Sequence, residues 1–205
     1  MATNLIVARG GIDFVPPISL SFWRWSLVFI ILFFFCFSHL KKKIKIIKKE
    51  FKKLFFLGLM GCGVCSVFPY KAGETTTIIN MGIIYTSSPI FIFIISNLFF
   101  KETVNKLKFI GLFSCLVGVL VIIVKGDLYL LLSLKFTTGD LWMLGASIGW
   151  ALYSVYLFQW KSNLGVFSRF TLISFFGCLS IFPFYLIEHN FITPTNFDIN
   201  FYIWI

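Results

Sequence analysis

Long runs of apolar residues constrain this chain more than any other feature of its sequence. Of its 205 residues, 59% are hydrophobic, only 13% are charged and 28 are phenylalanine. A soluble domain is about 25% charged, and a water-soluble core of this size could not bury so much apolar side chain. Because about 20 apolar residues cross a bilayer as a helix, the sequence predicts an all-α integral membrane protein.

Six apolar runs are predicted to be complete membrane spans, joined by polar or charged segments, of which residues 125–138 form a longer loop. They comprise residues 18–39, 54–70, 75–100, 109–124, 141–160 and 167–187. We expect residues 41–53 to form a loop and residues 71–74 a tight polar turn. An incomplete apolar run lies at each end of the chain, so both ends are expected to be truncated spans.

The basic residues are distributed unevenly among the predicted loops. The formal net charge is +10, and eight of the 18 Lys and Arg residues lie in residues 41–53, between two spans. This placement argues against nucleic-acid binding. It is instead typical of a membrane protein that follows the positive-inside rule, by which cytoplasmic loops are rich in Lys and Arg. With a cytoplasmic N-terminus, thirteen basic residues fall in inside loops and three in outside loops. We therefore expect a multi-pass protein of a bacterial inner membrane, whose polybasic segment chiefly fixes topology and also attracts anionic lipid.

The span at residues 75–102 carries polar residues that a purely structural span would lack. On a helix of 3.6 residues per turn, Asn80, Ser87 and Ser88 share one face with Thr77, and Tyr85 lies at its edge. Pro89 cannot donate to the carbonyl of Tyr85, which predicts a break in the helix. Such breaks are tolerated where hydroxyl groups, neighbouring helices or cavity water satisfy the freed acceptor. This span is predicted to line a polar cavity, although the same side chains could instead join helices.

Four segments, in order and spacing, resemble the drug/metabolite transporter superfamily, EamA type. The first hairpin of that family is similar to ATNLIVARGG followed by FVPPISLSFWRW, and its fourth helix to TTTIINMGIIYTSSPIFIFIISNLFFKE. Its fifth and sixth helices are similar to FIGLFSCLVGVLVII and GDLWMLGASIGWALYSVYLFQW. The resemblance implies a helical bundle of ten helices in two inverted five-helix repeats, the usual basis of alternating access. Residues 1–124 would be the first repeat, nearly complete with its first helix cut short. Residues 125–138 would be a connecting loop, and residues 139–205 the start of a partial second repeat.

Two further side chains are candidates for the cavity. Arg24 lies within a predicted span, where a charge is costly and is usually functional or paired. Alternatively, it could reach the interface between two flanking tryptophans. Tyr153 shares a helix face with Gly145 and Gly149, and could line the cavity or pack with them, because small residues four apart permit close helix contact. The pairs Gly58/Cys62, Gly61/Cys65 and Gly111/Cys115 have the same spacing, for which packing is the better interpretation.

The sequence offers no catalytic, metal or cofactor site. All five cysteines fall in apolar runs, and an odd number there predicts reduced thiols acting as small apolar residues. There is no phosphate-binding loop, catalytic carboxylate pair or nucleophile elbow. Glu74 could be a coupling carboxylate near the outer boundary, although a solvated turn residue is the simpler interpretation. We therefore expect no enzyme activity and no cofactor.

These features lead to two functional hypotheses. The first is a secondary transporter, an exporter of small polar or amphipathic metabolites through a central cavity, driven by a substrate gradient or by protons. In this hypothesis Arg24 attracts an anionic group, while Asn80, Ser88 and Tyr153 donate or accept hydrogen bonds. The second is a non-transporting fragment or membrane interaction subunit that needs a partner to complete the bundle; a homodimer is one such assembly.

Overall fold

The computed structural model describes residues 14–101 and 136–204, together with residues 7, 10, 11, 107, 110, 111, 113, 114, 117, 118 and 121. The secondary structure of these residues consists of helices joined by turns and irregular segments, without strands. Five helical segments are long and apolar enough to cross a membrane: Pro17–Lys42, Ile44–Gly73, Ile78–Phe100, Thr138–Gln159 and Val166–Ile192. The predicted spans at 18–39, 54–70, 75–100, 141–160 and 167–187 are thereby confirmed, and the sixth, at 109–124, lies outside the continuously described residues.

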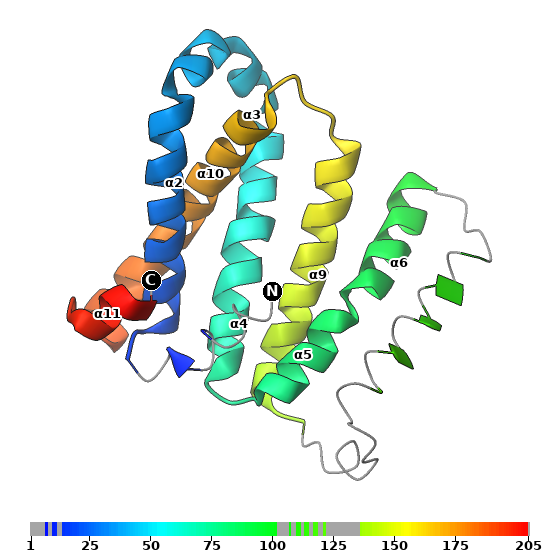
Figure 1. The fold of residues 1–205 in the computed structure, drawn as a ribbon, viewed down its shortest axis with the longest axis vertical. Helices are drawn as coiled ribbons and strands as arrows, with labels where there is room; N and C mark the ends of the chain where they lie inside the picture. The colour runs from blue at the N-terminus through cyan, green and yellow to red at the C-terminus, as the bar shows by residue number, and fades with distance from the viewer. Residues whose placement is uncertain are drawn as a thin grey trace.

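The long second span, residues 44–73, lies in the middle of the bundle with the other helices on either side of it (Figure 1). That span consists of α3 (Ile44–Gly58), the π-helical turn η1 (Leu59–Val64) and α4 (Cys65–Gly73). On one side, α10 (Val166–Ile187) packs against α2 (Pro17–Lys42), α3 and η1. On the other, α9 (Thr138–Gln159) packs against α4, η1, α5 (Ile78–Thr86) and α6 (Ser88–Phe100). Between them, helices α9 and α10 therefore contact all the other long helices.

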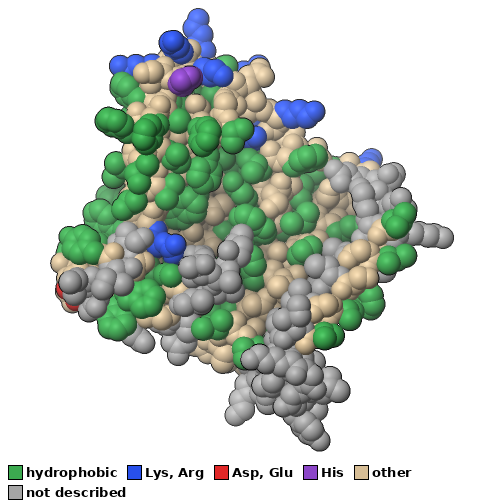
Figure 2. Space-filling model, viewed as in Figure 1, with side chains coloured by type: hydrophobic (Ala, Val, Ile, Leu, Met, Phe, Trp, Pro, Cys, Tyr) green, Lys and Arg blue, Asp and Glu red, His purple; other side chains and the backbone are tan. Residues whose placement is uncertain are grey.

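The polybasic segment is helical, which corrects the predicted loop at 41–53. Helix α2 continues to Lys42, α3 starts at Ile44, and only Lys43 between them leaves the helical conformation. Lysine is a good helix former, and the segment is amphipathic: Ile46 and Ile47 pack against a buried cluster while most of the lysines are exposed. Figure 2 shows Lys and Arg side chains gathered at this end of the molecule, above a surface rich in apolar side chains.

The two turns at the other end also differ from expectation. Residues 71–74 were predicted to be a turn, but α4 continues to Gly73 and the chain turns over residues 74–77 before α5 begins. The last predicted span is prolonged by the π-helical turn η2 (Glu188–Ile192), and the short helix α11 (Ile199–Trp204) follows. Phe201 of α11 joins the buried cluster of Leu20 and Tyr70.

Small residues allow the central helices to touch, as predicted. A Cβ on Gly58 would lie 2.7 Å from the backbone nitrogen of Gly177 and from the carbonyl oxygen of Ile173. A Cβ on Gly61 would lie 2.6 Å from the ring of Tyr153, and one on Gly149 would lie 2.7 Å from Val64. Packing is thus confirmed for these glycines, whereas Cys115 of the third pair lies outside the described residues. Apolar side chains such as Phe34 and Phe35 instead cover the outside, at 83% and 76% exposure, as expected for lipid-facing residues.

Candidate functional site

The span predicted to line a cavity is interrupted at Ser87, two residues before Pro89. Helix α5 ends at Thr86 and α6 begins at Ser88, with Pro89 in its first turn. The carbonyl oxygen of Ile84 accepts the Ser87 backbone N–H at 3.2 Å and the Ser87 hydroxyl at 2.6 Å. It also accepts the hydroxyl of Ser147 from α9 at 3.1 Å. Hydroxyl groups and a neighbouring helix therefore satisfy backbone acceptors at the break.

Arg24 of α2 is half-buried and interacts with Tyr70 of α4. Its guanidinium donates a hydrogen bond to the Tyr70 hydroxyl and lies 5.9 Å from the centre of the Tyr70 ring. The flanking tryptophans are also engaged within the bundle. Trp25 donates to the hydroxyl of Ser66 at 2.5 Å, and the Trp23 ring packs edge-on against Phe197 at 5.7 Å.

Asn80 faces a buried carboxylate that the sequence analysis did not single out. Asp140, near the start of α9, is 1% exposed. Its Oδ1 accepts the Thr76 hydroxyl at 2.5 Å and the Asn80 side-chain amide at 3.3 Å, and its Oδ2 accepts the same amide at 3.4 Å. Oδ2 also accepts the Thr137 backbone N–H at 2.7 Å and the Thr137 hydroxyl at 3.2 Å. One carboxylate thus joins the α4–α5 turn, α5 and the start of α9.

One sequence signal could have revealed Asp140. Thr137 and Asp140 form a capping box, in which an N-cap hydroxyl and an acidic residue three positions later satisfy each other's backbone N–H groups. That pattern predicts a helix start at Thr138. The bonds to Thr76 and Asn80 come from residues about sixty positions away, so no local pattern could predict them.

The aromatic candidates form a chain between α5 and α9. The Tyr85 ring lies 6.4 Å from that of Trp150, which lies 5.5 Å from that of Tyr153. Tyr153 also covers Gly61 of η1. Tyr85 packs against the same buried cluster that contains Tyr70, the partner of Arg24. Arg24, Tyr85 and Tyr153 are therefore linked through Tyr70 and Trp150, whereas Ser88, 6% exposed, is buried at the helix break.

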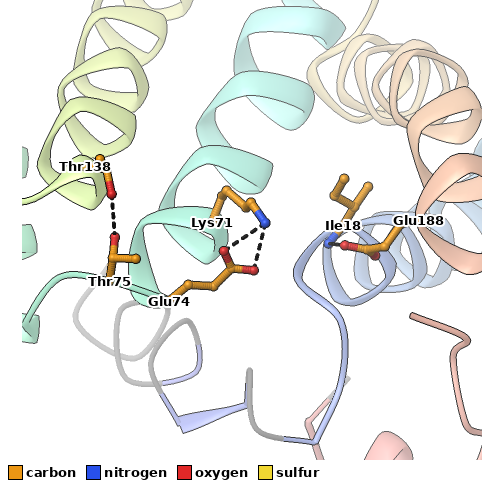
Figure 3. Close-up of polar contacts among 6 residues, drawn as sticks. All are labelled: Ile18, Lys71, Glu74, Thr75, Thr138 and Glu188. Atoms are coloured by element: carbon orange, nitrogen blue, oxygen red, sulfur yellow. Dashed lines mark hydrogen bonds and ion pairs between the residues drawn. The ribbon is translucent and has the colours of Figure 1, made fainter. Parts of the chain in front are cut away.

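A second buried carboxylate, Glu188, was also missed. It is 3% exposed at the end of α10 and accepts the backbone N–H groups of Ile18 and Ser19 at 3.1 and 2.7 Å, and the Ser19 hydroxyl at 2.9 Å. Figure 3 shows Glu188 at the start of α2, at the same end of the bundle as Lys71 and Glu74. Glu74 pairs with Lys71 at 2.8 Å on the surface. This position agrees with the simpler interpretation of Glu74, a solvated turn residue.

Other groups in the described part of the chain offer little for metal or redox chemistry. No three His, Cys, Asp or Glu side chains there come close enough together to hold a metal ion. The four described cysteines, Cys36, Cys62, Cys65 and Cys178, are free and buried. This confirms for these four the prediction of thiols packed as small apolar residues.

The fold and these polar groups define a multi-pass helical membrane protein. The chain belongs to the EamA-like transporter family, whose sequence profile matches residues 1–124. It is 25% identical over 150 residues to the uncharacterized transporter YyaM of Bacillus subtilis (strain 168), covering 73% of this chain and 49% of the relative. It is 30% identical over 157 residues to the uncharacterized transporter YoaV of the same organism, covering 74% and 51%.

A third relative aligns over almost the whole chain. An uncharacterized transporter of Archaeoglobus fulgidus is 27% identical over 200 residues, covering 96% of this chain and 66% of the relative. The chain spans about half the length of the first two relatives. No solved structure matches it significantly.

Proposed function

We propose that this chain is a secondary transporter that exports small polar or amphipathic metabolites through a central cavity by alternating access. The observation that carries the proposal is Arg24, a cation held by Tyr70 between two membrane-spanning helices of a transporter-family chain. A charge at such a position is costly in a bilayer and is usually functional or paired. The interrupted span α5–α6 supports the proposal, because broken helices recur at transporter binding sites.

In the proposed mechanism, substrate enters between the spans that carry Arg24, Tyr85 and Tyr153. An anionic group on the substrate would exchange for the Tyr70 hydroxyl as a hydrogen-bond acceptor of Arg24. Ser87, Ser88 and Asn80 would donate or accept hydrogen bonds from the α5–α6 side. The apolar part of the substrate would contact the aromatic rings, which provide large apolar faces with polar edges. The site would open alternately to the two sides of the membrane, as the inverted repeats implied by the family resemblance would allow.

Replacing Arg24 by alanine is expected to reduce export at least about tenfold, because hydrogen bonds to a charged group are among the strongest in a binding site. Export would be measured by mass spectrometry of metabolites in the medium of cells that express the chain. Membrane yield and detergent-extracted monodispersity would show whether insertion is intact. Arg24→Lys, which keeps the charge but not the planar guanidinium, is expected to retain part of the export.

A matched control is Lys161→Ala, which removes an exposed cation at the end of α9. It is expected to export as the unmodified chain does. Normal export by both Arg24→Ala and Asn80→Ala would contradict the assignment of these residues to the substrate site. The unmodified chain could instead export no metabolite alone, but export when a second copy or the C-terminal helices of the longer relatives are co-expressed. That result would favour the subunit hypothesis, with a homodimer as one form.

The orientation of the chain is proposed from its lysines. The turn between α2 and α3 would lie in the cytoplasm of a cell whose inner membrane holds the protein, with the N-terminus on the same side. Replacing Lys41, Lys42, Lys45, Lys48 and Lys49 by glutamine is expected to increase the inverted fraction several-fold, since basic loops are retained inside. A reporter active on one side only, inserted at Gly165, would measure that fraction.

The control for this experiment is Lys71→Gln, which removes a basic residue from the opposite end of the bundle and is expected to leave the orientation unchanged. An unchanged orientation in the five-lysine variant would contradict the proposed topology signal.

Coupling to protons is a separate proposal, which predicts that export responds to a pH gradient imposed on vesicles.

A further inference from the structure

Two buried carboxylates lie at the same end of the bundle, opposite the lysine-rich turn between α2 and α3. Asp140 and Glu188 are 1% and 3% exposed. Figure 3 shows this end with Glu188 on one side and Thr138, two residues before Asp140, on the other. We call it the carboxylate end, and the end that holds residues 41–53 the lysine end.

Each of these carboxylates joins the part of the chain within residues 1–124 to a helix that comes after residue 124. Asp140 of α9 accepts hydrogen bonds from Thr76 and Asn80, at 2.5 and 3.3 Å. Glu188, after α10, accepts both backbone N–H groups and the hydroxyl that the start of α2 presents at Ile18 and Ser19. The Ser19 hydroxyl also lies 2.8 Å from the hydroxyl of Thr195. Both junctions are buried and involve an acceptor that carries a full charge when ionised.

The junctions at the lysine end are of a different kind. The Lys43 ammonium donates to the carbonyl oxygen of Asn163 at 2.7 Å in an exposed position. The Ser162 hydroxyl donates to Glu50 at 2.6 Å in a partly buried one. Solvent competes for exposed hydrogen bonds and ion pairs, which therefore contribute little to stability. Breaking a buried junction to a charged group instead leaves buried polar partners without a hydrogen bond. The two hydrogen bonds at the lysine end are therefore expected to separate more easily than the junctions at the carboxylate end.

We propose that Asp140 and Glu188 are positioning residues of a gate, which hold the carboxylate end closed in this conformation and must release their partners for that end to open. The proposal rests on the proposed transport function, since it assigns one end of the same route. It accounts for a feature that helix capping alone does not explain. Thr137 already completes the capping box with Asp140, yet Thr76 and Asn80 add hydrogen bonds to the same carboxylate from across the junction.

A buried reporter position lies in the cluster held by both junctions. Met81 is 0% exposed and belongs to the cluster that also contains Leu20, next to Ser19, and Met143, three residues after Asp140. Its counterpart toward the lysine end is Leu57, also 0% exposed, which belongs to a separate cluster with Leu54 and Leu164. A cysteine at position 81 therefore reports on opening of the carboxylate end, and a cysteine at position 57 reports on loosening elsewhere.

The test measures the rate at which a water-soluble maleimide labels each cysteine in the chain reconstituted in lipid nanodiscs, with the labelled site identified by peptide mass spectrometry. The isosteric variants Asp140→Asn and Glu188→Gln are each expected to accelerate labelling in Met81→Cys about tenfold, because hydrogen bonds to an ionised acceptor are about twice as strong as neutral ones. Labelling in Leu57→Cys is expected to stay unchanged in both variants. Thr76→Val combined with Asn80→Ala should accelerate labelling at position 81 similarly while leaving the capping box intact.

Two controls separate gating from general destabilisation. Thr138→Val removes an exposed hydroxyl contact with Thr75 at the same end, 3.4 Å long, and is expected to change neither rate. Equal acceleration at positions 57 and 81, or no acceleration at position 81, would overturn the gate. Because labelling needs no substrate, unchanged labelling with intact export refutes the gate alone. Absent export in an unmodified chain that labels normally refutes the transport function instead.

Discussion

Replacing Gly58 by alanine is expected to destabilise the protein by about 1–3 kcal/mol, the usual cost of inserting a methyl group into a filled core. The new Cβ would lie 2.7 Å from the backbone nitrogen of Gly177, 2.7 Å from the carbonyl oxygen of Ile173 and 2.8 Å from the Cβ of Phe176. None of these atoms is the end of a flexible side chain, so α3 and α10 would have to move apart. Thermal unfolding in detergent, followed by loss of monodisperse protein, would measure the change.

The matched control is Gly82→Ala, within α5. Among the described residues, apart from its chain neighbours and the nearby backbone of its own helix, no atom lies within 4 Å of the Cβ position there. Alanine is favoured over glycine in a helix by about 1 kcal/mol. This variant is expected to be as stable as the unmodified chain or slightly more so. If Gly58→Ala were as stable as Gly82→Ala, the close contact between α3 and α10 would be incorrect.

The second large effect is expected at Asp140. Replacement by alanine removes the acceptor of hydrogen bonds from Thr76, Asn80 and Thr137, leaving buried donors without it. We expect a loss of about 3 kcal/mol, typical of removing one partner from a buried charged network. Asp140→Asn keeps the shape and one oxygen acceptor, so its loss should be smaller. The same thermal unfolding assay applies.

An acidic residue on the surface provides the comparison. Glu74 pairs with Lys71, but the two side chains are 35% and 42% exposed. Exposed pairs contribute at most about 1 kcal/mol, so Glu74→Ala should be close to neutral. A loss at Glu74 equal to that at Asp140 would mean that burial does not distinguish the two carboxylates.

The spans were predictable because a bilayer imposes one simple requirement. Backbone polar groups within hydrocarbon must be satisfied inside the segment, so each long apolar run becomes a helix. The prediction was wrong where water, instead of lipid, surrounds the chain. Residues 41–53 were assigned to a loop because of their charge, but lysines on an amphipathic helix can remain in water while Ile46 and Ile47 pack inward.

The candidate site was predictable only in part. The polar residues of the interrupted span and the cation Arg24 stand out because such side chains are rare within apolar runs. Tyr70, Thr76 and Asp140 did not stand out, since each lies close to the end of a span, where polar residues are ordinary. Their significance depends on partners 46 to 64 residues away.

The sequence by itself therefore determined the class of protein, the five confirmed spans and the position of the helix interruption, because hydropathy, helix length and proline chemistry are local properties. Only the tertiary structure decided that Arg24 binds Tyr70, that Asp140 joins α9 to Asn80, and that Glu188 caps the start of α2. These pairings depend on which helices lie side by side. In a membrane that choice is made by close packing at residues such as Gly58 and Gly177, and no local pattern encodes it.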